Sequence, residues 1–294
     1  MFSLIVGGLT VGSIYALIAC GFVLIFKGTS LLNFAHGAMV LLGGYVAYEV
    51  AQVFGFWAAL VVSAATVGVL GWIIQRSIFS RLKARPLVEM FMIALGLDVI
   101  LFSLISGYRP WSVTPKSVPN PWGSDTIIVL GTNVRLASLG MIVISTVLLA
   151  GLGLYLRYSR TGLAMQVTSL DREVATILGV RVDRYFVVSW ILAGALAGIA
   201  GAFLGIFPNL LEPQTHGIAM RALPAVILGG IDSVPGTWLA ALLLGLFEVF
   251  TVSFAPDWIG DGFHRVMPYV IMFFVLLLRP QGFFGTRERE VARL

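Results

Sequence analysis

Three polar features interrupt long apolar stretches of this 294-residue sequence. They are the segment Asn33-Phe34-Ala35-His36-Gly37, the segment Gly229-Gly230-Ile231-Asp232-Ser233 followed by Pro235-Gly236, and the single acid Glu248. A polar side chain surrounded by lipid needs a partner, so these residues are candidates for a transport or binding function. Two simpler interpretations stay open at this point: a histidine that only packs helices, and a plain turn at the glycine pair.

The sequence gives little support for a catalytic function. Ser13 and His36 are the pair that an intramembrane protease would use, but nothing in the sequence places them within hydrogen-bond reach. The single cysteine, Cys20, excludes an intramolecular disulfide, and no metal-ligand spacing is present. None of the three lysines lies in the glycine-rich loop that binds ATP. We therefore predict that the chain is not an enzyme and has no catalytic residue, metal site or cofactor of its own.

The composition is that of a membrane protein. Hydrophobic residues make up 59% of the chain and charged residues 11%, against about 25% charged in an ordinary soluble domain. The mean hydropathy is +0.97. Soluble enzymes, disordered chains and coiled coils are excluded by these values.

Apolar stretches near 20 residues long are read as helices, because unpaired backbone groups in hydrocarbon cost several kcal/mol each. We expect an all-α polytopic bundle with eight or nine transmembrane segments, some broken or re-entrant, in one transmembrane domain over residues 1–294. The candidate segments are Leu4 to Phe26, Leu31 to Tyr48, Phe56 to Gln75, Leu87 to Gly107, Leu136 to Leu156, Phe186 to Phe207, Ile218 to Ile231, Val234 to Ser253 and Val266 to Leu278.

The distribution of Lys and Arg predicts the orientation in the membrane. The windows 76–85, 157–184 and 279–293 together hold 13 of the 19 basic residues. Because basic loops stay in the cytoplasm, we expect these windows and the C-terminus inside and the N-terminus outside. The proline-rich segment 108–135 is then expected to be an external loop anchored by Trp111 and Trp122. The basic pI is explained by these cytoplasmic loops, so we expect no nucleic-acid partner.

The window 157–184 is long for a turn between two helices. Within it, residues 173–179 predict a short amphipathic helix that ends at Gly179. The spacing of Glu173, Ala175 and Gly179 resembles the EAA loop of ABC importer permeases, which docks into a groove on the ATPase subunit, although Val174 stands at the second alanine position. An interfacial helix without a partner is the alternative. The residues expected at the ATPase contact are Asp171, Arg172, Glu173, Ala175, Leu178 and Gly179.

Taken together, five motifs resemble the branched-chain amino acid ABC transporter permease family. They occur in the order of the family and cover nearly the whole chain, while Asp98 and Arg109 fall outside its pattern. The motifs are Thr10-Val11-Gly12-Ser13-Ile14-Tyr15-Ala16-Leu17, Asn33 to Gly37, Gly229-Gly230 with Pro235-Gly236, Glu248, and Arg279-Pro280-Gln281-Gly282.

The resemblance implies a permease subunit of the bacterial inner membrane. It would work with two ATPase subunits that hydrolyse ATP, a second permease that is similar or identical, and a periplasmic substrate-binding protein. Its cargo would be branched-chain or related amino acids, or, in close relatives, urea or short amides. The residues expected along the translocation path are Ser13, Tyr15, Asn33, His36, Gly37, Gly229, Gly230 and Glu248.

Two further hypotheses remain. An ion-coupled secondary transporter could use Glu89, Asp98 and Glu248 as ion carriers, but it would leave the long cytoplasmic loop without a role. The dipeptides His36-Gly37 and His216-Gly217 follow similar apolar segments and fall on opposite sides of the membrane. This is the pattern of an inverted repeat with a path between its halves.

Overall fold

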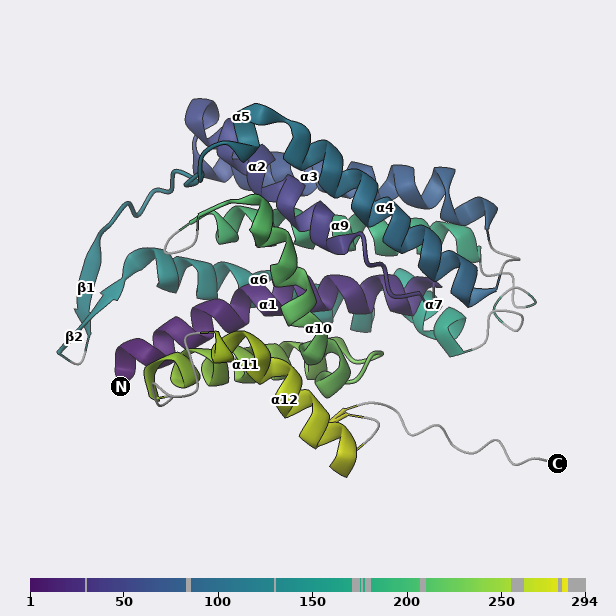
Figure 1. Cartoon of the computed structure of the whole chain (residues 1–294). Coiled ribbons are helices and arrows are strands. Elements are labelled where there is room, and N and C mark those ends of the chain that lie inside the picture. The colour runs from purple at the N-terminus through teal and green to yellow at the C-terminus, as the bar shows by residue number, and fades with distance from the viewer. Residues whose placement is uncertain are drawn as a thin grey trace.

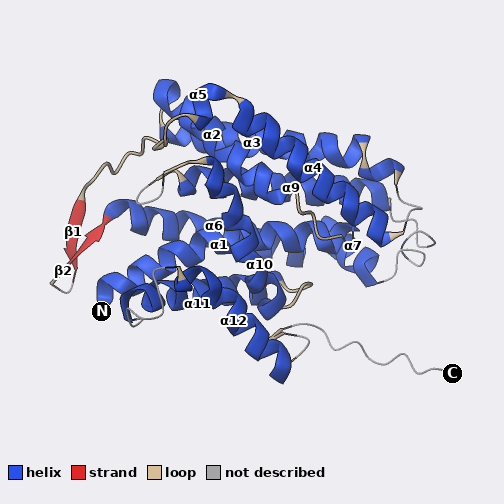
Figure 2. Ribbon diagram, viewed as in Figure 1, coloured by secondary structure: helices blue, strands red, loops and turns tan. Residues whose placement is uncertain are grey.

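The computed structural model describes residues 1–29, 31–82, 86–129, 131–170, 175, 177, 181–206, 210–254, 262–279 and 282–284. Figure 2 shows that the described chain is almost entirely helical. The elements, labelled in Figure 1, are α1 (Phe2–Thr29), α2 (His36–Phe54), α3 (Phe56–Ser77), the 3-10 helix η1 (Phe79–Arg81), α4 (Leu87–Gly107), α5 (Arg109–Ser112), β1 (Thr126–Val129), β2 (Thr132–Arg135), α6 (Leu136–Tyr158), α7 (Arg160–Leu170), α9 (Val182–Leu204), the 3-10 helix η2 (Pro213–Gly217), α10 (Ile218–Gly229), α11 (Val234–Phe254) and α12 (Phe263–Leu278).

Each of the nine expected segments corresponds to one helix, and the polytopic helical bundle is confirmed. Among the described residues, seven helices are long and apolar enough to cross a membrane: α1, α2, α3, α4, α6, α9 and α11. The apolar helix α12 is shorter, at 16 residues. Helix α10 has 12 residues, which is about 18 Å and too short for a full crossing.

The break between α10 and α11 has a local cause. Gly230 has a φ of 95°, in the left-handed region that favours glycine, and Pro235 stands in the first turn of α11. Gly229 lies so close to the backbone of Thr237 that a side chain there would collide with it. From the C-terminal segment, the Phe283 amide donates a 2.7 Å hydrogen bond to the carbonyl of Leu228, which satisfies one group at the end of α10.

Two close helix crossings repeat the same packing. On α1, a methyl group added to Gly12 would stand 2.7 Å from Leu242 Cα on α11. On α9, a methyl group added to Gly198 would stand 2.6 Å from the carbonyl oxygen of Ser63 on α3. Gly8 and Gly194 lie one turn earlier and approach the same two helices. Spacing of this kind lets helix backbones approach closely.

The repeated crossings relate two halves of the chain. Helices α1 and α9 run in opposite directions in Figure 1, as do α3 and α11. The pairs α1–α11 and α9–α3 make the most extensive helix contacts, and α2 packs on α3 and α4 as α10 packs on α11 and α12. The structure therefore has an inverted repeat, with α1 to α4 equivalent to α9 to α12 and α6 and α7 inserted between them.

The described basic residues of the three windows gather at one end of the bundle. Helices α3 and α6 end there, α9 begins there, and α7 lies there, while the N-terminus and the β1–β2 hairpin lie at the opposite end (Figure 1). The basic residues at these helix ends are Arg76, Arg81, Arg157, Arg160, Arg181 and Arg184. This segregation follows the charge pattern of the sequence.

The expected external loop contains structure that the sequence did not indicate. Thr126–Val129 and Thr132–Arg135 pair as an antiparallel hairpin, and Arg109–Ser112 form the short helix α5. Trp111 stacks on Tyr45 of α2, with ring centroids 5.1 Å apart and planes within 5°. Trp122 packs against Phe56 at the start of α3. The two tryptophans therefore hold this loop against the middle of α2 and the start of α3.

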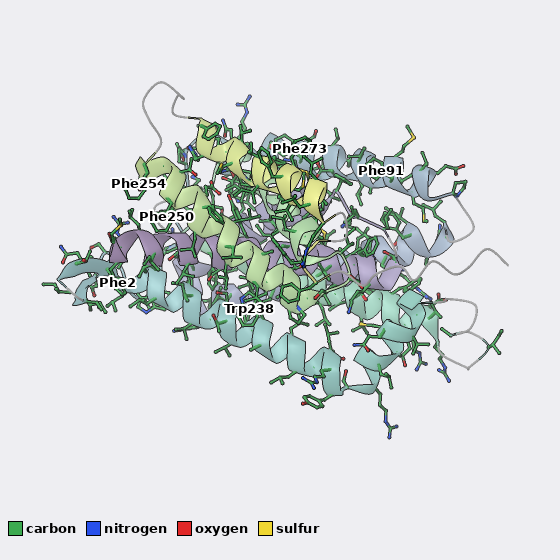
Figure 3. The ribbon with its side chains drawn as sticks, turned by 90° about the horizontal axis from the view of Figure 1, so that it is seen from below. Phe2, Phe91, Trp238, Phe250, Phe254 and Phe273 are labelled. Atoms are coloured by element: carbon green, nitrogen blue, oxygen red, sulfur yellow. The ribbon has the colours of Figure 1, made fainter. Side chains whose placement is uncertain are left out.

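The outer surface of the bundle is apolar. Figure 3 shows Phe250, Phe254 and Phe273 projecting from α11 and α12. Phe254 is 58% exposed and Phe273 is 59% exposed. In water such a surface would be unfavourable, whereas against lipid chains it costs nothing.

Candidate functional site

A buried polar cluster joins three helices at Glu248. The Tyr15 hydroxyl of α1 donates a 2.5 Å hydrogen bond to Glu248 Oε2 on α11. Arg221 of α10 contacts the other oxygen, with Nη1 3.4 Å from Oε1. The Glu248 side chain is 9% exposed and that of Arg221 is 25% exposed. An acid at the centre of a membrane helix costs about 2.5 to 3.5 kcal/mol on insertion, and these two donors offset part of that cost.

This cluster forms one wall of a cavity of about 300 Å³. Its lining comes from the first half of α1, the end of α9, the start of α10, the C-terminal part of α11 and the first turn of α12. The start of α1, the end of α11 and the start of α12 lie at the same end of the bundle in Figure 1, the end that carries the N-terminus. Its lining is mixed: Tyr15, Arg221, Glu248, His264 and Arg265 are polar, and Val11, Ile14, Leu204, Ile218, Val249 and Val252 are apolar. A concave site with apolar walls and a few convergent charges is the usual form of a small-molecule site.

His264 lies outside the apolar segment predicted from Val266 to Leu278. The structure places it in the first turn of α12, where it lines the cavity. The difference arises because α12 begins three residues earlier than the apolar stretch from Val266. Helix starts accept polar residues, so hydropathy alone misses the first turn.

Asn33 and His36 shape the start of α2. The Asn33 side-chain oxygen accepts a 3.2 Å hydrogen bond from the amide of Ala35, and the Asn33 carbonyl accepts one from the amide of His36. The His36 ring is fully buried, with its centroid 4.7 Å from that of Phe22 on α1. It lies over Gly21, where a methyl group would stand 2.5 Å from His36 Nε2. Both side chains are therefore placed where they can support helix packing, and a role in the path stays a prediction.

The position of His36 over Gly21 contradicts the protease hypothesis. Ser13 is buried on α1, eight residues before Gly21, where His36 packs. Eight residues correspond to about 12 Å along a helix, far beyond hydrogen-bond reach. Ser13 and His36 therefore do not form a nucleophile and base pair.

The two His-Gly dipeptides meet in space, so they do not lie on opposite sides of the membrane as the charge pattern predicted. Gly37 faces His216, and a methyl group added to Gly37 would stand 3.1 Å from His216 Nε2. The same nitrogen lies 2.9 Å from Oδ1 and 3.0 Å from Oδ2 of Asp98 on α4. Phe102 packs on the His216 ring, with centroids 4.7 Å apart. Asp98, which lies outside the expected family pattern, therefore ties α4 to the segment before α10.

The expected path residues do not form one site. Tyr15 and Glu248 are brought together, while Asn33, His36 and Gly37 lie at the start of α2 and the pair Gly229-Gly230 lies at the end of α10. Arg221 was not among the residues predicted for the path. Its pairing with Glu248 could not be predicted, because 27 residues and a helix break separate the two.

The expected ATPase-contact segment lies mostly outside the described residues. Asp171, Arg172, Glu173, Leu178 and Gly179 are not described, whereas Ala175 and Ile177 are helical. Ala175 is fully buried and Ile177 is 84% exposed. Before this segment, Arg160–Leu170 form α7, a helix that the sequence analysis did not propose.

Comparison with known proteins identifies the family. Residues 4–276 match the family model described as "Branched-chain amino acid transport system / permease component". The chain belongs to this permease family. The resemblance expected from the sequence motifs is thereby confirmed.

Curated relatives of this permease match over nearly their whole length. It is 27% identical over 301 residues to the high-affinity branched-chain amino acid transport system permease protein LivH of Escherichia coli (strain K12), covering 96% of this chain and 95% of LivH. It is 28% identical to the permease protein BraD of Pseudomonas aeruginosa, covering 97% and 96%. The probable branched-chain amino acid transport permease protein LivH of Methanocaldococcus jannaschii is 28% identical, with 98% and 94% covered. This permease is therefore a multi-pass transport protein of the ABC type.

Proposed function

We propose that this permease is the membrane subunit of an ABC importer that moves branched-chain or related amino acids across the bacterial inner membrane. The observation that carries the proposal is the family match over residues 4–276, together with the branched-chain amino acid permeases that the chain matches over nearly their full length. The buried cluster of Tyr15, Arg221 and Glu248 supports it, because paired charges inside membrane helices are typical of transport pathways.

The charged end of the bundle supports one orientation in the membrane. The end with Arg76, Arg157 and Arg184 faces the cytoplasm, in agreement with the positive-inside rule. The N-terminus and the cavity at Glu248 then face the periplasm, and α12 runs back toward the cytoplasm with the C-terminus.

The energy for transport comes from other chains. Two ATPase subunits bind at the cytoplasmic end, contact the segment from Asp171 to Gly179 and hydrolyse ATP, so this chain needs no cofactor of its own. A second permease, similar or identical, completes the membrane part, and a periplasmic binding protein delivers the cargo. The inverted repeat suits alternating access, because two halves with opposite orientation exchange roles when the path opens to the other side.

Purification of the tagged chain from its native membrane in mild detergent tests the assembly. Mass spectrometry of the bound proteins should detect ATPase subunits and a permease, and the ligand of the associated binding protein should be an aliphatic amino acid. A urea or amide ligand would overturn the amino-acid cargo while keeping the importer. Recovery of the folded chain alone, in repeated preparations, would overturn the ABC assembly.

The coupling role of the 157–184 window has its own test. A bulky replacement, Gly179→Trp, should lower both cargo uptake and cargo-stimulated ATPase activity in a stably inserted complex. Gly151→Ala is the control, because Gly151 lies on α6 with open space around it. Unchanged transport and ATPase activity in Gly179→Trp would refute the coupling role.

A further inference from the structure

The cavity beside Glu248 has a charge composition that helix packing does not require. Arg221, Arg265 and Glu248 line it, so two basic side chains and one acidic side chain border the cavity and its lining carries a net positive charge. The contact between Arg221 Nη1 and Glu248 Oε1 is 3.4 Å, long for a charge-assisted hydrogen bond, and it uses one of five N–H donors. Buried ion pairs are a weak source of stability compared with apolar residues of similar size.

The inverted repeat supplies an internal comparison. The packing of Gly12 on Leu242 corresponds to that of Gly198 on Ala64. With this alignment, Gly201 on α9 stands at the position equivalent to Tyr15, and Leu70 on α3 at the position equivalent to Glu248. In the other half, the equivalent crossing therefore has a glycine and a leucine at these two positions and no polar pair.

The remaining walls define the kind of ligand that fits. Ile14 and Val11 of α1 face the cavity with Ile218 of α10 and Val249 of α11, and these aliphatic side chains border the charged groups. A volume of about 300 Å³ is at the small end of ligand sites. A ligand with one carboxylate, one ammonium group and a short aliphatic side chain would satisfy all three parts of the lining.

We propose that this cavity is a binding site for a zwitterionic aliphatic amino acid within the permease itself. The guanidinium groups of Arg221 and Arg265 bind the α-carboxylate, since a planar guanidinium matches a carboxylate in a two-point contact. Glu248, oriented by the Tyr15 hydroxyl, binds the ammonium group, and the aliphatic walls hold the side chain. The assignment rests on the proposed amino-acid cargo and gives it a site in this chain.

The test is equilibrium binding of labelled leucine to the purified complete complex without its binding protein. We expect saturable binding to the wild type, with leucinamide and 4-methylpentanoate each competing at least about tenfold more weakly, because each lacks one charged group. Arg221→Gln should remove the preference for leucine over leucinamide, and Glu248→Gln the preference over 4-methylpentanoate. A purely structural role would not link each variant to one functional group of the ligand.

Matched controls lie outside the cavity. Arg109→Gln and Glu49→Gln change the same residue types on α5 and α2 and should leave both preferences at the wild-type ratio. If Arg221→Gln does not fold, Arg221→Lys keeps the charge, removes the two-point contact and should still lower the preference over leucinamide. Wild-type ratios in Arg221→Lys and Glu248→Gln would overturn the site.

Failure of this proposal can be told apart from failure of the proposed function. ATP-driven uptake of leucine into proteoliposomes, with the binding protein present, tests the cargo. A wild-type complex that imports leucine but shows no saturable binding without the binding protein overturns the cavity site alone. A complex that imports no aliphatic amino acid overturns the proposed function.

Discussion

The hydroxyl of Tyr15 donates a 2.5 Å hydrogen bond to Glu248, across 233 residues of sequence. This bond joins α1 to α11, the pair of helices with the most extensive contact in the molecule. It also orients the carboxylate that faces Arg221. The bond that holds α1 against α11 therefore also positions a charged group of the cavity.

Tyr15→Phe should destabilise the protein by about 1.5 to 3 kcal/mol, because the change removes a hydrogen bond to a buried charged group. Thermal unfolding of the purified complex in detergent measures the effect. Tyr45→Phe is the control: the Tyr45 hydroxyl is buried and has no hydrogen-bond partner among the described residues. An equal loss of stability in both variants would contradict a specific role for the Tyr15 bond.

Gly12→Ala should weaken the crossing of α1 and α11. A methyl group at this position would stand 2.7 Å from Leu242 Cα, a backbone atom that cannot move aside cheaply. The expected cost is about 1 to 3 kcal/mol, as for overpacking of a core, and thermal unfolding checks it.

Gly151→Ala is the matched control for the glycine crossing. Nothing lies within 4 Å of the added methyl group, and alanine favours helix by about 1 kcal/mol over glycine. The control should be neutral or slightly stabilising. If Gly12→Ala matched this control, the close approach of the two helices would not be essential.

Gly230→Ala should destabilise the turn between α10 and α11, since its φ of 95° is unfavourable for any residue with a side chain. A loss of about 1 kcal/mol or more in stability, measured by thermal unfolding, is the expected result. Gly217→Ala provides the comparison, because Gly217 has a φ of −64° and open space around it. That variant should retain wild-type stability.

Asp98→Ala should loosen the attachment of α4, because His216 would lose both oxygens that lie within 3.0 Å of its Nε2. We expect a loss of about 1 to 3 kcal/mol in thermal unfolding. Asp98→Asn keeps an acceptor at the same place and should lose less. If the order of the two variants were reversed, the contact would not act as a hydrogen bond.

Uptake should depend on ATP and not on an ion gradient. Asp98 and Glu248 are engaged by His216 and by Tyr15 and Arg221, so neither is placed as an isolated ion carrier. In proteoliposomes, a protonophore or sodium ionophore should leave ATP-driven uptake unchanged. Uptake driven by a gradient without ATP would favour the secondary transporter instead.

Much of the fold could be predicted from the chain alone. Lipid leaves few choices for the backbone, so an apolar stretch such as Leu136 to Leu156 becomes a helix, and the structure has α6 there. Local chemistry also located the break at Gly229-Gly230, because glycine and proline disfavour continued helix. The hairpin of β1 and β2 was missed, since four-residue strands carry little pattern.

Only part of the candidate site could be predicted from the sequence. Tyr15 and Glu248 were predicted because a polar residue within an apolar helix can be recognised from the sequence alone. Arg221 and His264 were not assigned to the site, since each becomes part of it only through the packing of α10 and α12 beside α11.

Local sequence was thus sufficient for the apolar helices, for the family and for the segregation of charge to one end, because each depends on the solvation of residues near one another in the chain. Which distant residues contact each other depended on the tertiary structure. Glycine spacing on α1 lets its backbone approach that of α11, the helix that carries Glu248, the partner of Tyr15. Gly37 meets His216 through the packing of α2 against the segment before α10. Contacts between residues more than a hundred positions apart are set by how helices cross, which hydropathy does not record.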